Sequence, residues 1–184
     1  MIHPIVKFGD PVLEKPSEPI TSFDEDLKKL VEDMFESMYA AHGVGLAAPQ
    51  IRISKRVAVV DVTFKDDPRA KLVLINPEME LSDETEMGTE GCLSFPEITG
   101  EIERAKSVMA RGQTLEGDKI EIEATGLLAR ALQHEADHLN GILFIDRMSS
   151  AAKASLSSRL KRLQKETRRS GGKDRPSLVG ETTL

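Results

Sequence analysis

The sequence predicts an α+β fold in which mainly antiparallel sheets pack around a central helix, with a further helix near the C-terminus. Three observations lead to this prediction. Apolar residues recur at helical spacing over about 24–41 and 126–139. Short strand-like runs lie between these two helices. At 184 residues, with 39 % apolar and 30 % charged residues, the chain has the size and balance of one globular domain.

The first forty residues divide into an irregular segment and a helix. Residues 1–20 contain four of the nine prolines and are expected to be irregular. Thr21 or Ser22 is suited to cap a helix from about residue 24 to residue 41, and Gly43 is suited to end it. The apolar positions of this helix, spaced by three and four residues, are Leu27, Leu30, Val31, Met34, Met38 and Ala41.

Four strands are predicted between this helix and the next. The runs RVAVVDVT at 56–63 and KLVLINPEM at 71–79 are rich in strand-forming residues and are separated by the polar turn KDDPRA. The runs SVMARGQT at 107–114 and KIEIEAT at 119–125 are predicted to form a hairpin through LEGD. Strands that precede a central helix in this way favour the α+β class.

Two helices follow these strands. Thr125 is suited to cap a helix over 126–139. A further helix is predicted over about 149–169, and the polar residues 170–184 are expected to form a disordered tail. We therefore expect one domain over 1–169 that includes the C-terminal helix.

Composition and charge restrict the setting of the protein. No apolar run approaches the length of a membrane span, and the N-terminus MIHPIVKFGDP lacks a secretion-signal pattern, so a cytoplasmic protein is expected. The single cysteine excludes an internal disulfide. Residues 151–184 carry nine Lys and Arg against three Asp and Glu, whereas residues 1–150 carry a net charge of −12. A polyanion would therefore contact the basic C-terminal region.

The segment QHEADHLNG at 133–141 contains the pattern HExxH. His134 and His138 lie about one helical turn apart, so both imidazoles can bind one divalent metal, with Glu135 as the base. On a helical wheel all three fall on the apolar side, among leucines. The opposite, polar side holds Arg130, Gln133, Asp137 and Asn140. Because burial of three polar groups without partners is costly, we predict a metal site here, not two ordinary core histidines.

Two ligands make an incomplete site, and the sequence offers three sources for a third. The position of the third histidine in the metzincin pattern is occupied by Phe144, which cannot bind a metal. The downstream glutamate of thermolysin-like peptidases would have to be Glu166, which lies in a charge-rich surface segment. Cys92, in EGCLSFP, offers a thiolate, and a Cys/His/His set leaves a fourth position open for water. Cys92 is therefore the predicted third ligand.

Three segments together resemble the peptide deformylase family: GVGLAAPQ at 43–50, EGCLS at 90–94 and QHEADHLNG at 133–141. They stand in that family's order and at similar spacing, and DPVLEKPS at 10–17 and INPE at 75–78 also fit. The resemblance implies an α+β fold and a deformylase catalytic domain over residues 1–169. It also implies hydrolysis of the N-formyl group from nascent chains that begin with formyl-methionine, with release of formate.

The family's residue roles carry over to the matching positions only. The implied metal ligands are Cys92, His134 and His138. Glu135 would be the general acid and base, while Gln50 with its side-chain amide and Leu93 with its backbone N–H would donate to the formyl oxygen. The substrate-binding candidates are Val44, Gly45, Glu90, Leu127 and Ala131. Chemistry supports these roles, because hydrolysis of a formamide needs activated water, donors to the oxyanion and a proton for the leaving amine.

The ligand types leave the metal open. Thiolate and imidazole suit Fe²⁺, Zn²⁺, Ni²⁺ and Co²⁺. The resemblance implies Fe²⁺ as the active metal.

Outside the predicted ligands, charge alone suggests an ion pair between Arg104 and Asp137. His3 and His42 fall outside the ligand pattern and are expected to take no part in the site.

The expected partners are formyl-methionyl nascent peptides, with transient docking on the ribosome through the basic C-terminal helix. No binding to membranes or DNA is expected. Two alternatives stay open: a metallopeptidase that cuts internal peptide bonds, and a metal- or peptide-binding protein at the ribosome without turnover. Glu135 and Gln50 argue against the second, because binding alone needs neither.

Overall fold

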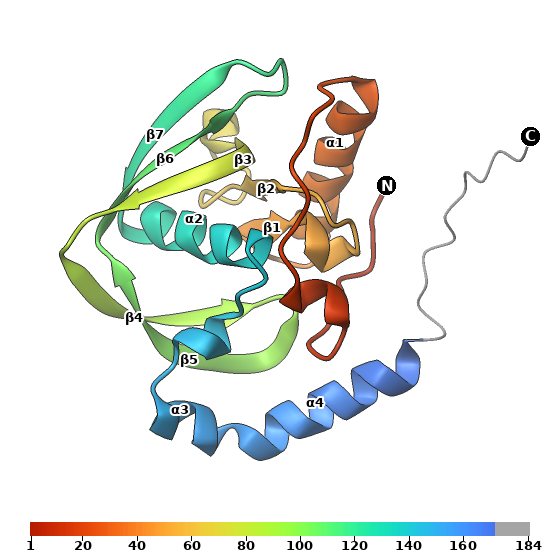
Figure 1. Cartoon of the computed structure of the whole chain (residues 1–184), viewed down its shortest axis with the longest axis vertical. Helices are drawn as coiled ribbons and strands as arrows, with labels where there is room; N and C mark the ends of the chain where they lie inside the picture. The colour runs from red at the N-terminus through yellow and green to blue at the C-terminus, as the bar shows by residue number, and fades with distance from the viewer. Residues whose placement is uncertain (172–184) are drawn as a thin grey trace, which may run out of the picture.

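The computed structural model describes residues 1–171, and within them two antiparallel sheets surround a central helix (Figure 1). Five strands pair in the order β1-β2-β3-β6-β7, and β4 and β5 form a separate hairpin. The strands are β1 Gly45–Ala47, β2 Val57–Val60, β3 Leu72–Leu81, β4 Thr85–Cys92, β5 Phe95–Ala105, β6 Ser107–Gln113 and β7 Lys119–Thr125. The predicted α+β class with mainly antiparallel sheets is confirmed.

The helices are α1 Glu25–Ala40, α2 Gly126–Leu139, α3 Ser150–Ser155 and α4 Ser157–Ser170. Within residues 1–171, four short 3-10 turns accompany them: η1 Pro11–Glu14, η2 Ala48–Ile51, η3 Pro68–Ala70 and η4 Phe144–Arg147. The α1 helix begins after Asp24, whose carboxylate accepts from the Leu27 N–H at 3.0 Å and so caps the helix. Among the described residues, none of the helices has the length and apolarity that crossing a bilayer requires.

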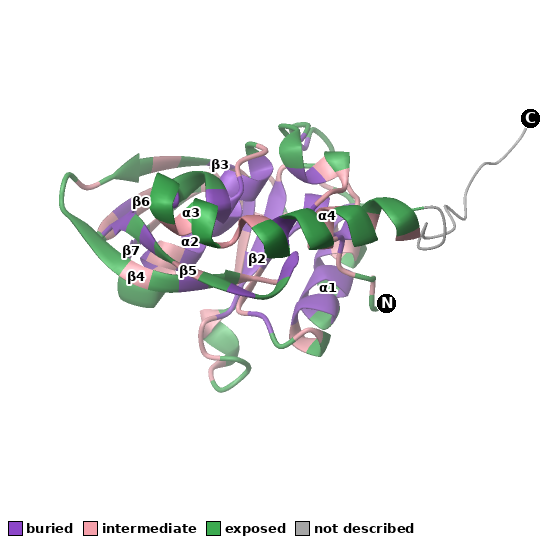
Figure 2. Ribbon diagram, turned by 90° about the horizontal axis from the view of Figure 1, so that it is seen from below, coloured by how far each residue is buried: buried purple, intermediate pink, exposed green. Residues whose placement is uncertain are grey.

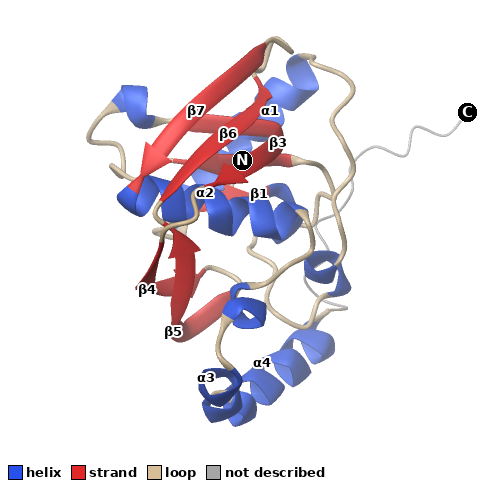
Figure 3. Cartoon of the chain, turned by 60° about the vertical axis from the view of Figure 1, so that its left-hand side comes forward, coloured by secondary structure: helices blue, strands red, loops and turns tan. Residues whose placement is uncertain are grey.

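The sheet is covered on both faces by helices, because alternate side chains of its strands point to opposite sides. In β2, Val57 and Val59 pack in a core with α1, whereas Ala58 and Val60 pack in a core with α2. The same alternation continues in β1, where Leu46 joins the first core and Ala47 the second. The sheet thus holds α2 from one side, and the β4–β5 hairpin lies across the other side of this helix (Figure 3).

The polar side of α2 is not a solvent-exposed side, contrary to the simplest interpretation of the helical wheel. Gln133 and Asp137 are buried, whereas Leu127, on the apolar side, is 58 % exposed. The Gln133 amide exchanges hydrogen bonds with the backbone of Ala105 in β5, at 3.1 and 3.0 Å. The hairpin therefore covers the polar side of the helix with hydrogen-bonding partners.

The C-terminal region differs from the prediction in one respect. Instead of one helix over 149–169, α3 and α4 meet at Leu156, whose side chain packs against a third core formed by the N-terminal segment, β5, η4 and Leu160. The remaining surface of α4 is largely exposed (Figure 2). Of the predicted tail, Ser170 still belongs to α4, and residues 172–184 lie outside the described residues.

Candidate metal centre

The three predicted ligands come from two elements that meet in the interior. His134 and His138 lie on the same side of α2, and Cys92 ends β4 at an irregularity in the β4–β5 register after Gly91. The ligand atoms of these residues lie within 4.8 Å of one another, and the Cys92 Sγ is 3.3 Å from the His138 Nε2. Both histidines are buried. The fold therefore converges a thiol and two imidazoles on one point.

Glu90 orients the first of these histidines. Its carboxylate lies 2.9 Å from the Nδ1 of His134, which leaves the Nε2 of that ring as the ligand atom. Arg104 donates to both Glu90 oxygens, at 3.0 and 3.1 Å, and Arg130 lies 3.3 Å from one of them. Burial alone would raise the pKa of Glu90, but the hydrogen bonds from His134 and Arg104 outweigh it and lower the pKa to about 2. Glu90 is therefore anionic at neutral pH.

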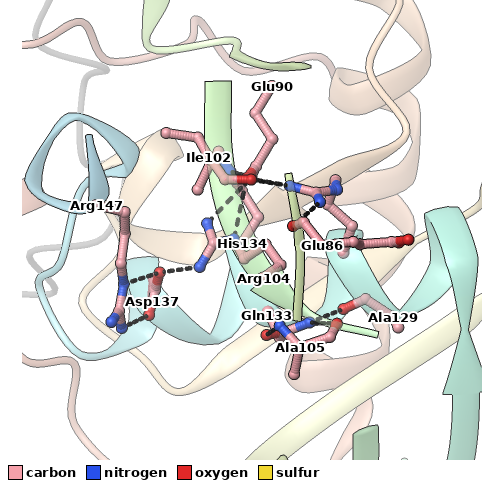
Figure 4. Close-up of polar contacts among 11 residues, drawn as sticks. Glu86, Glu90, Ile102, Arg104, Ala105, Ala129, Gln133, His134, Asp137 and Arg147 are labelled. Atoms are coloured by element: carbon pink, nitrogen blue, oxygen red, sulfur yellow. Dashed lines mark hydrogen bonds and ion pairs between the residues drawn. The ribbon is translucent and has the colours of Figure 1, made fainter. Parts of the chain in front are cut away.

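The contacts continue from Glu90 to Arg147 (Figure 4), whose side chain is 45 % exposed. Arg104 also donates to the Asp137 carboxylate at 2.6 Å, which confirms the ion pair predicted from charge. Arg147 in η4 donates to the same carboxylate at 2.7 and 3.1 Å. A line of alternating charges thus runs from His134 through Glu90, Arg104 and Asp137 to Arg147, and no motif in the sequence indicated its last member.

The surroundings fit a cation at the point where the ligand atoms converge. Burial lowers the pKa of His138 well below its ordinary value, so this ring is in the neutral form that binds metals. For His134, burial would also lower the pKa, but the neighbouring Cys92 and Glu90 outweigh it and raise the pKa. The surroundings of His134 therefore favour a positive charge at that ring. A thiolate with two imidazoles is a donor set that suits Fe²⁺, Zn²⁺, Ni²⁺ or Co²⁺.

Glu135 lies beside the ligands as a buried carboxylate. It is 4 % exposed, and burial raises its pKa to about 7. In the described part of the chain its Oε2 has no hydrogen-bond partner, a costly state for a buried carboxylate without a function. Gly45 of β1 packs directly on this group, because a Cβ at Gly45 would lie 2.9 Å from the Glu135 Cδ and closer still to Oε1. The absence of a side chain at Gly45 therefore makes room for the carboxylate.

Gln50 faces the ligands from η2. Its Oε1 accepts from the Ala47 N–H at 2.9 Å, which directs the amide nitrogen toward Ser94 Oγ, at 3.2 Å, and Cys92 Sγ, at 3.6 Å. Leu93 follows Cys92 in the turn between β4 and β5. A Cβ at Gly43 would lie 2.6 Å from the Leu93 Cδ1, so the Leu93 side chain packs closely against that glycine.

A cavity of about 570 Å³ opens onto the ligands. It is lined by every predicted site residue except His138: Val44, Gly45, Gln50, Glu90, Cys92, Leu93, Leu127, Ala131, His134 and Glu135. His42, which the motif comparison placed outside the site, also lines it and stacks on Phe64 with ring centroids 6.1 Å apart. Lys7 and Arg130 are further lining residues. Sequence reasoning missed Lys7 and His42, because neither belongs to a ligand pattern.

A buried HExxH helix, completed by a cysteine from a neighbouring hairpin and opening on a cavity, defines a metal-dependent hydrolase. Comparison with known proteins identifies the class further. Residues 2–154 match the family model for polypeptide deformylase. The peptide deformylase of Acidobacterium capsulatum is 51 % identical over 165 residues, which cover 90 % of this chain and 97 % of that protein.

Solved structures agree with the sequence relatives. Peptide deformylase 1B of Arabidopsis thaliana, in complex with an inhibitor, superposes with a TM-score of 0.88 at 37 % identity, covering 97 % of this chain and 98 % of that one. The peptide deformylase of Thermotoga maritima gives a TM-score of 0.76 at 51 % identity, covering 81 % and 99 %. The chain belongs to the polypeptide deformylase family, enzymes that remove the N-formyl group from the formyl-methionine of newly synthesised proteins.

Proposed function

We propose that one divalent metal ion is held by Cys92, His134 and His138 and that this ion is Fe²⁺ in the active enzyme. The support is the convergence of the three ligand atoms and the hydrogen bond that fixes His134 through its Nδ1. The same donors suit Zn²⁺, Ni²⁺ and Co²⁺. The choice of iron rests on the family resemblance.

A bound divalent metal supplies a Lewis acid that polarises the formyl carbonyl and makes water more acidic. Glu135 accepts a proton from the attacking water, and a pKa of about 7 suits this task near neutral pH. The formyl carbon gains a C–O bond and becomes tetrahedral. The C–N bond then breaks, and Glu135 returns the proton to the departing amine. The products are formate and a peptide with a free N-terminal methionine.

Two donors stabilise the charge that develops on the formyl oxygen. We assign them to the side-chain amide of Gln50 and the backbone N–H of Leu93; both residues line the cavity, as does Cys92. Donors placed in this way before the reaction begins need no reorganisation as charge develops, and the loss of one typically costs about 10²–10³ in rate.

The methionine side chain of the substrate occupies the apolar part of the cavity, at Val44, Leu127 and Ala131, with Gly45 on the lining strand. Glu90 also lines the cavity, but its carboxylate is engaged by His134 and Arg104. We therefore assign Glu90 a role that acts through His134, and not contact with the substrate.

Beyond the site, we propose that residues 1–169 act as one catalytic unit in the cytoplasm and that the enzyme docks transiently on the ribosome. The support for docking is the row of exposed cations on α4, which includes Arg162, Lys165 and Arg169. Such docking should weaken steeply as salt is raised.

The observation that carries this function is the convergence of Cys92 and two imidazoles beside the buried Glu135. The test is formate release from a formyl-Met-Ala-Ser peptide by anaerobically prepared, iron-loaded protein, beside a Glu135→Ala variant. Acetyl-Met-Ala-Ser and a longer peptide are also assayed, because a metallopeptidase would cleave their internal peptide bonds. We expect formate from the first peptide only, and its loss in the variant.

Cleavage of internal bonds would identify a metallopeptidase instead. Tight binding of iron and nickel without formate release would identify a binding protein that has kept the metal ligands alone.

A further inference from the structure

Three successive residues near the N-terminus contact the two segments that carry the oxyanion donors. The Val6 N–H donates to the Gln50 carbonyl at 2.7 Å, and the Phe8 N–H donates to the Ser94 carbonyl at 2.9 Å. Between them, the Lys7 ammonium donates to the Leu93 carbonyl at 2.7 Å. The short segment 6–8 therefore bridges η2 and the β4–β5 turn.

These two segments need such a bridge, because Gln50 and Leu93 are far apart in sequence and lie in elements that do not share a sheet ladder. The amide nitrogen of Gln50 reaches Ser94 Oγ at 3.2 Å and Cys92 Sγ at 3.6 Å, so these side-chain contacts between η2 and the hairpin all depend on one amide group. The two donors act on one oxygen atom only if their relative position is fixed to a fraction of an ångström.

The backbone of segment 6–8 is itself firmly anchored. Val6 and Phe8 are buried in the third core, and Phe8 stacks on Phe95 of β5 with ring centroids 4.9 Å apart. Lys7 points to the other side and lines the active-site cavity with Gln50 and Leu93. An anchored backbone therefore holds the Lys7 ammonium at a defined place beside the turn.

The contact of Lys7 restricts the peptide unit that follows the one carrying the Leu93 N–H, and the two units share the Leu93 Cα. The carbonyl of Leu93 is held by the Lys7 ammonium, and its side chain is held against Gly43. With both groups fixed, rotation about the Leu93 backbone bonds is limited, and the direction of its N–H is limited with it.

We propose that Lys7 is a positioning residue of the deformylase reaction, which fixes the oxyanion site through the carbonyl of Leu93. This inference rests on the proposed role of Gln50 and Leu93 as oxyanion donors. Lys7 acts on the transition state and not on the binding of substrate or metal.

The test compares iron-loaded wild type with Lys7→Met, which keeps the aliphatic stem and loses the ammonium, and with Lys7→Arg, which keeps a cationic donor. Lys15→Met, at an exposed lysine, is the matched control. Turnover number, KM for formyl-Met-Ala-Ser, bound iron and the thermal unfolding midpoint are measured for each. We expect Lys7→Met to lower kcat by about 10-fold to 100-fold, as displacement of a catalytic group does, with KM and bound iron unchanged. Lys7→Arg should recover part of the loss.

The kcat of Gln50→Leu, alone and combined with Lys7→Met, distinguishes failure of the Lys7 proposal from failure of the oxyanion assignment on which it rests. If both residues serve one oxyanion site, the two losses in kcat are coupled, and the loss in the double variant differs from their product. Full activity of Gln50→Leu would overturn the oxyanion assignment, and the role of Lys7 with it. A slow Gln50→Leu beside an unchanged kcat in Lys7→Met would overturn the Lys7 proposal alone. A rise in KM only, or loss of iron in Lys7→Met, would also overturn it, because Lys7 would then contact the substrate or support Cys92.

Discussion

The helices α2 and α4 have the same length, 14 residues each, and opposite surroundings. Ten residues of α2 are buried, among them four charged or titratable ones, whereas Leu160 is the one buried residue of α4. In α2 each polar side chain is held in place by the sheet or the hairpin, or directed into the site. In α4 most of the charges lie in solvent. The comparison indicates that chemistry here depends on buried polar groups, and that the charges of α4 serve the outer surface.

The largest expected effect is on the rate of formate release, and it distinguishes Glu135 of α2 from Glu166 of α4. Glu135→Gln keeps the shape of the side chain but removes the base, so formate release should fall by about 10²–10⁴-fold. Glu166→Gln on α4 is the matched control, because that carboxylate is exposed and paired with Arg162 at 3.8 Å. The initial rate of formate release measures both. Equal rates in the two variants would show that the buried carboxylate of α2 contributes no more to turnover than the exposed carboxylate of α4.

The next effect concerns the support of α2 by the hairpin. Glu90→Gln removes the negative charge that faces His134 and Arg104, and we expect a loss of about 10-fold to 100-fold in metal affinity or activity. Metal affinity is measured by competition with a chelator. Glu86→Gln, at an exposed position on the same strand, should leave the affinity unchanged. A Glu90→Gln protein with wild-type affinity and turnover would show that His134 needs no such support.

Burial of a carboxylate does not by itself indicate catalysis, as Asp61 and Glu135 illustrate. Asp61 is fully buried like Glu135, yet its pKa moves in the opposite direction. Burial would raise the pKa of Asp61, but hydrogen bonds from Tyr39, Thr63 and the Lys65 N–H outweigh it and lower the pKa to about 2. Because the folded pKa lies below the unfolded one, the charged group stabilises the fold above about pH 4, and this contribution is lost as pH falls toward 2.

The test is the thermal unfolding midpoint of Asp61→Asn between pH 6 and pH 2. We expect the variant to be less stable at pH 6 by roughly 1.5–3 kcal/mol, the usual worth of hydrogen bonds to a charged group. The difference from wild type should shrink toward pH 2. Asp66→Asn, at an exposed position in the same loop, is the control. A difference that does not depend on pH would contradict the assignment.

The smallest expected effect on turnover is that of α4. Reversal of three exposed charges, with Arg162→Glu, Lys165→Glu and Arg169→Glu, should change formate release from a short peptide by less than about 2-fold. Cosedimentation with ribosomes should fall strongly in the same variant, and in the wild type as salt is raised. Cosedimentation that neither the substitutions nor salt affects would remove α4 from the docking surface.

The predictions from sequence succeeded where a local pattern was sufficient. The bounds of α2 match the predicted 126–139, and β6 and β7 pair across the predicted turn. The β4–β5 hairpin was not predicted, because its strands contain glycines and many glutamates and are held by distant groups. Arg130 is one such group: it donates to the Ile102 carbonyl at 2.9 Å and packs over Gly88. Such contacts join residues far apart in the chain and leave no local signal.

The residues of the candidate site were likewise predicted where a local motif contained them and missed where none did. The HExxH pattern and the EGCLS segment contain the predicted ligands, and the structure brings those residues together. Arg147 and Lys7 were not foreseen, because neither belongs to a repeated spacing: Arg147 is joined to the site through Asp137, and Lys7 through the carbonyl of Leu93. The exposed position of Leu127 was also missed, because a helical wheel places a residue around the helix axis but not relative to the helix ends.

We propose that α2 divides its buried polar residues into metal ligands and a proton carrier. The most direct test is the amount of iron bound per chain, measured by elemental analysis after anaerobic loading and removal of free metal. We expect close to one iron per chain in the wild type and in Glu135→Gln. The iron content should be far lower in Cys92→Ala, His134→Ala and His138→Ala. Full iron content in any of the three ligand variants, or loss of iron in folded Glu135→Gln, would contradict this division.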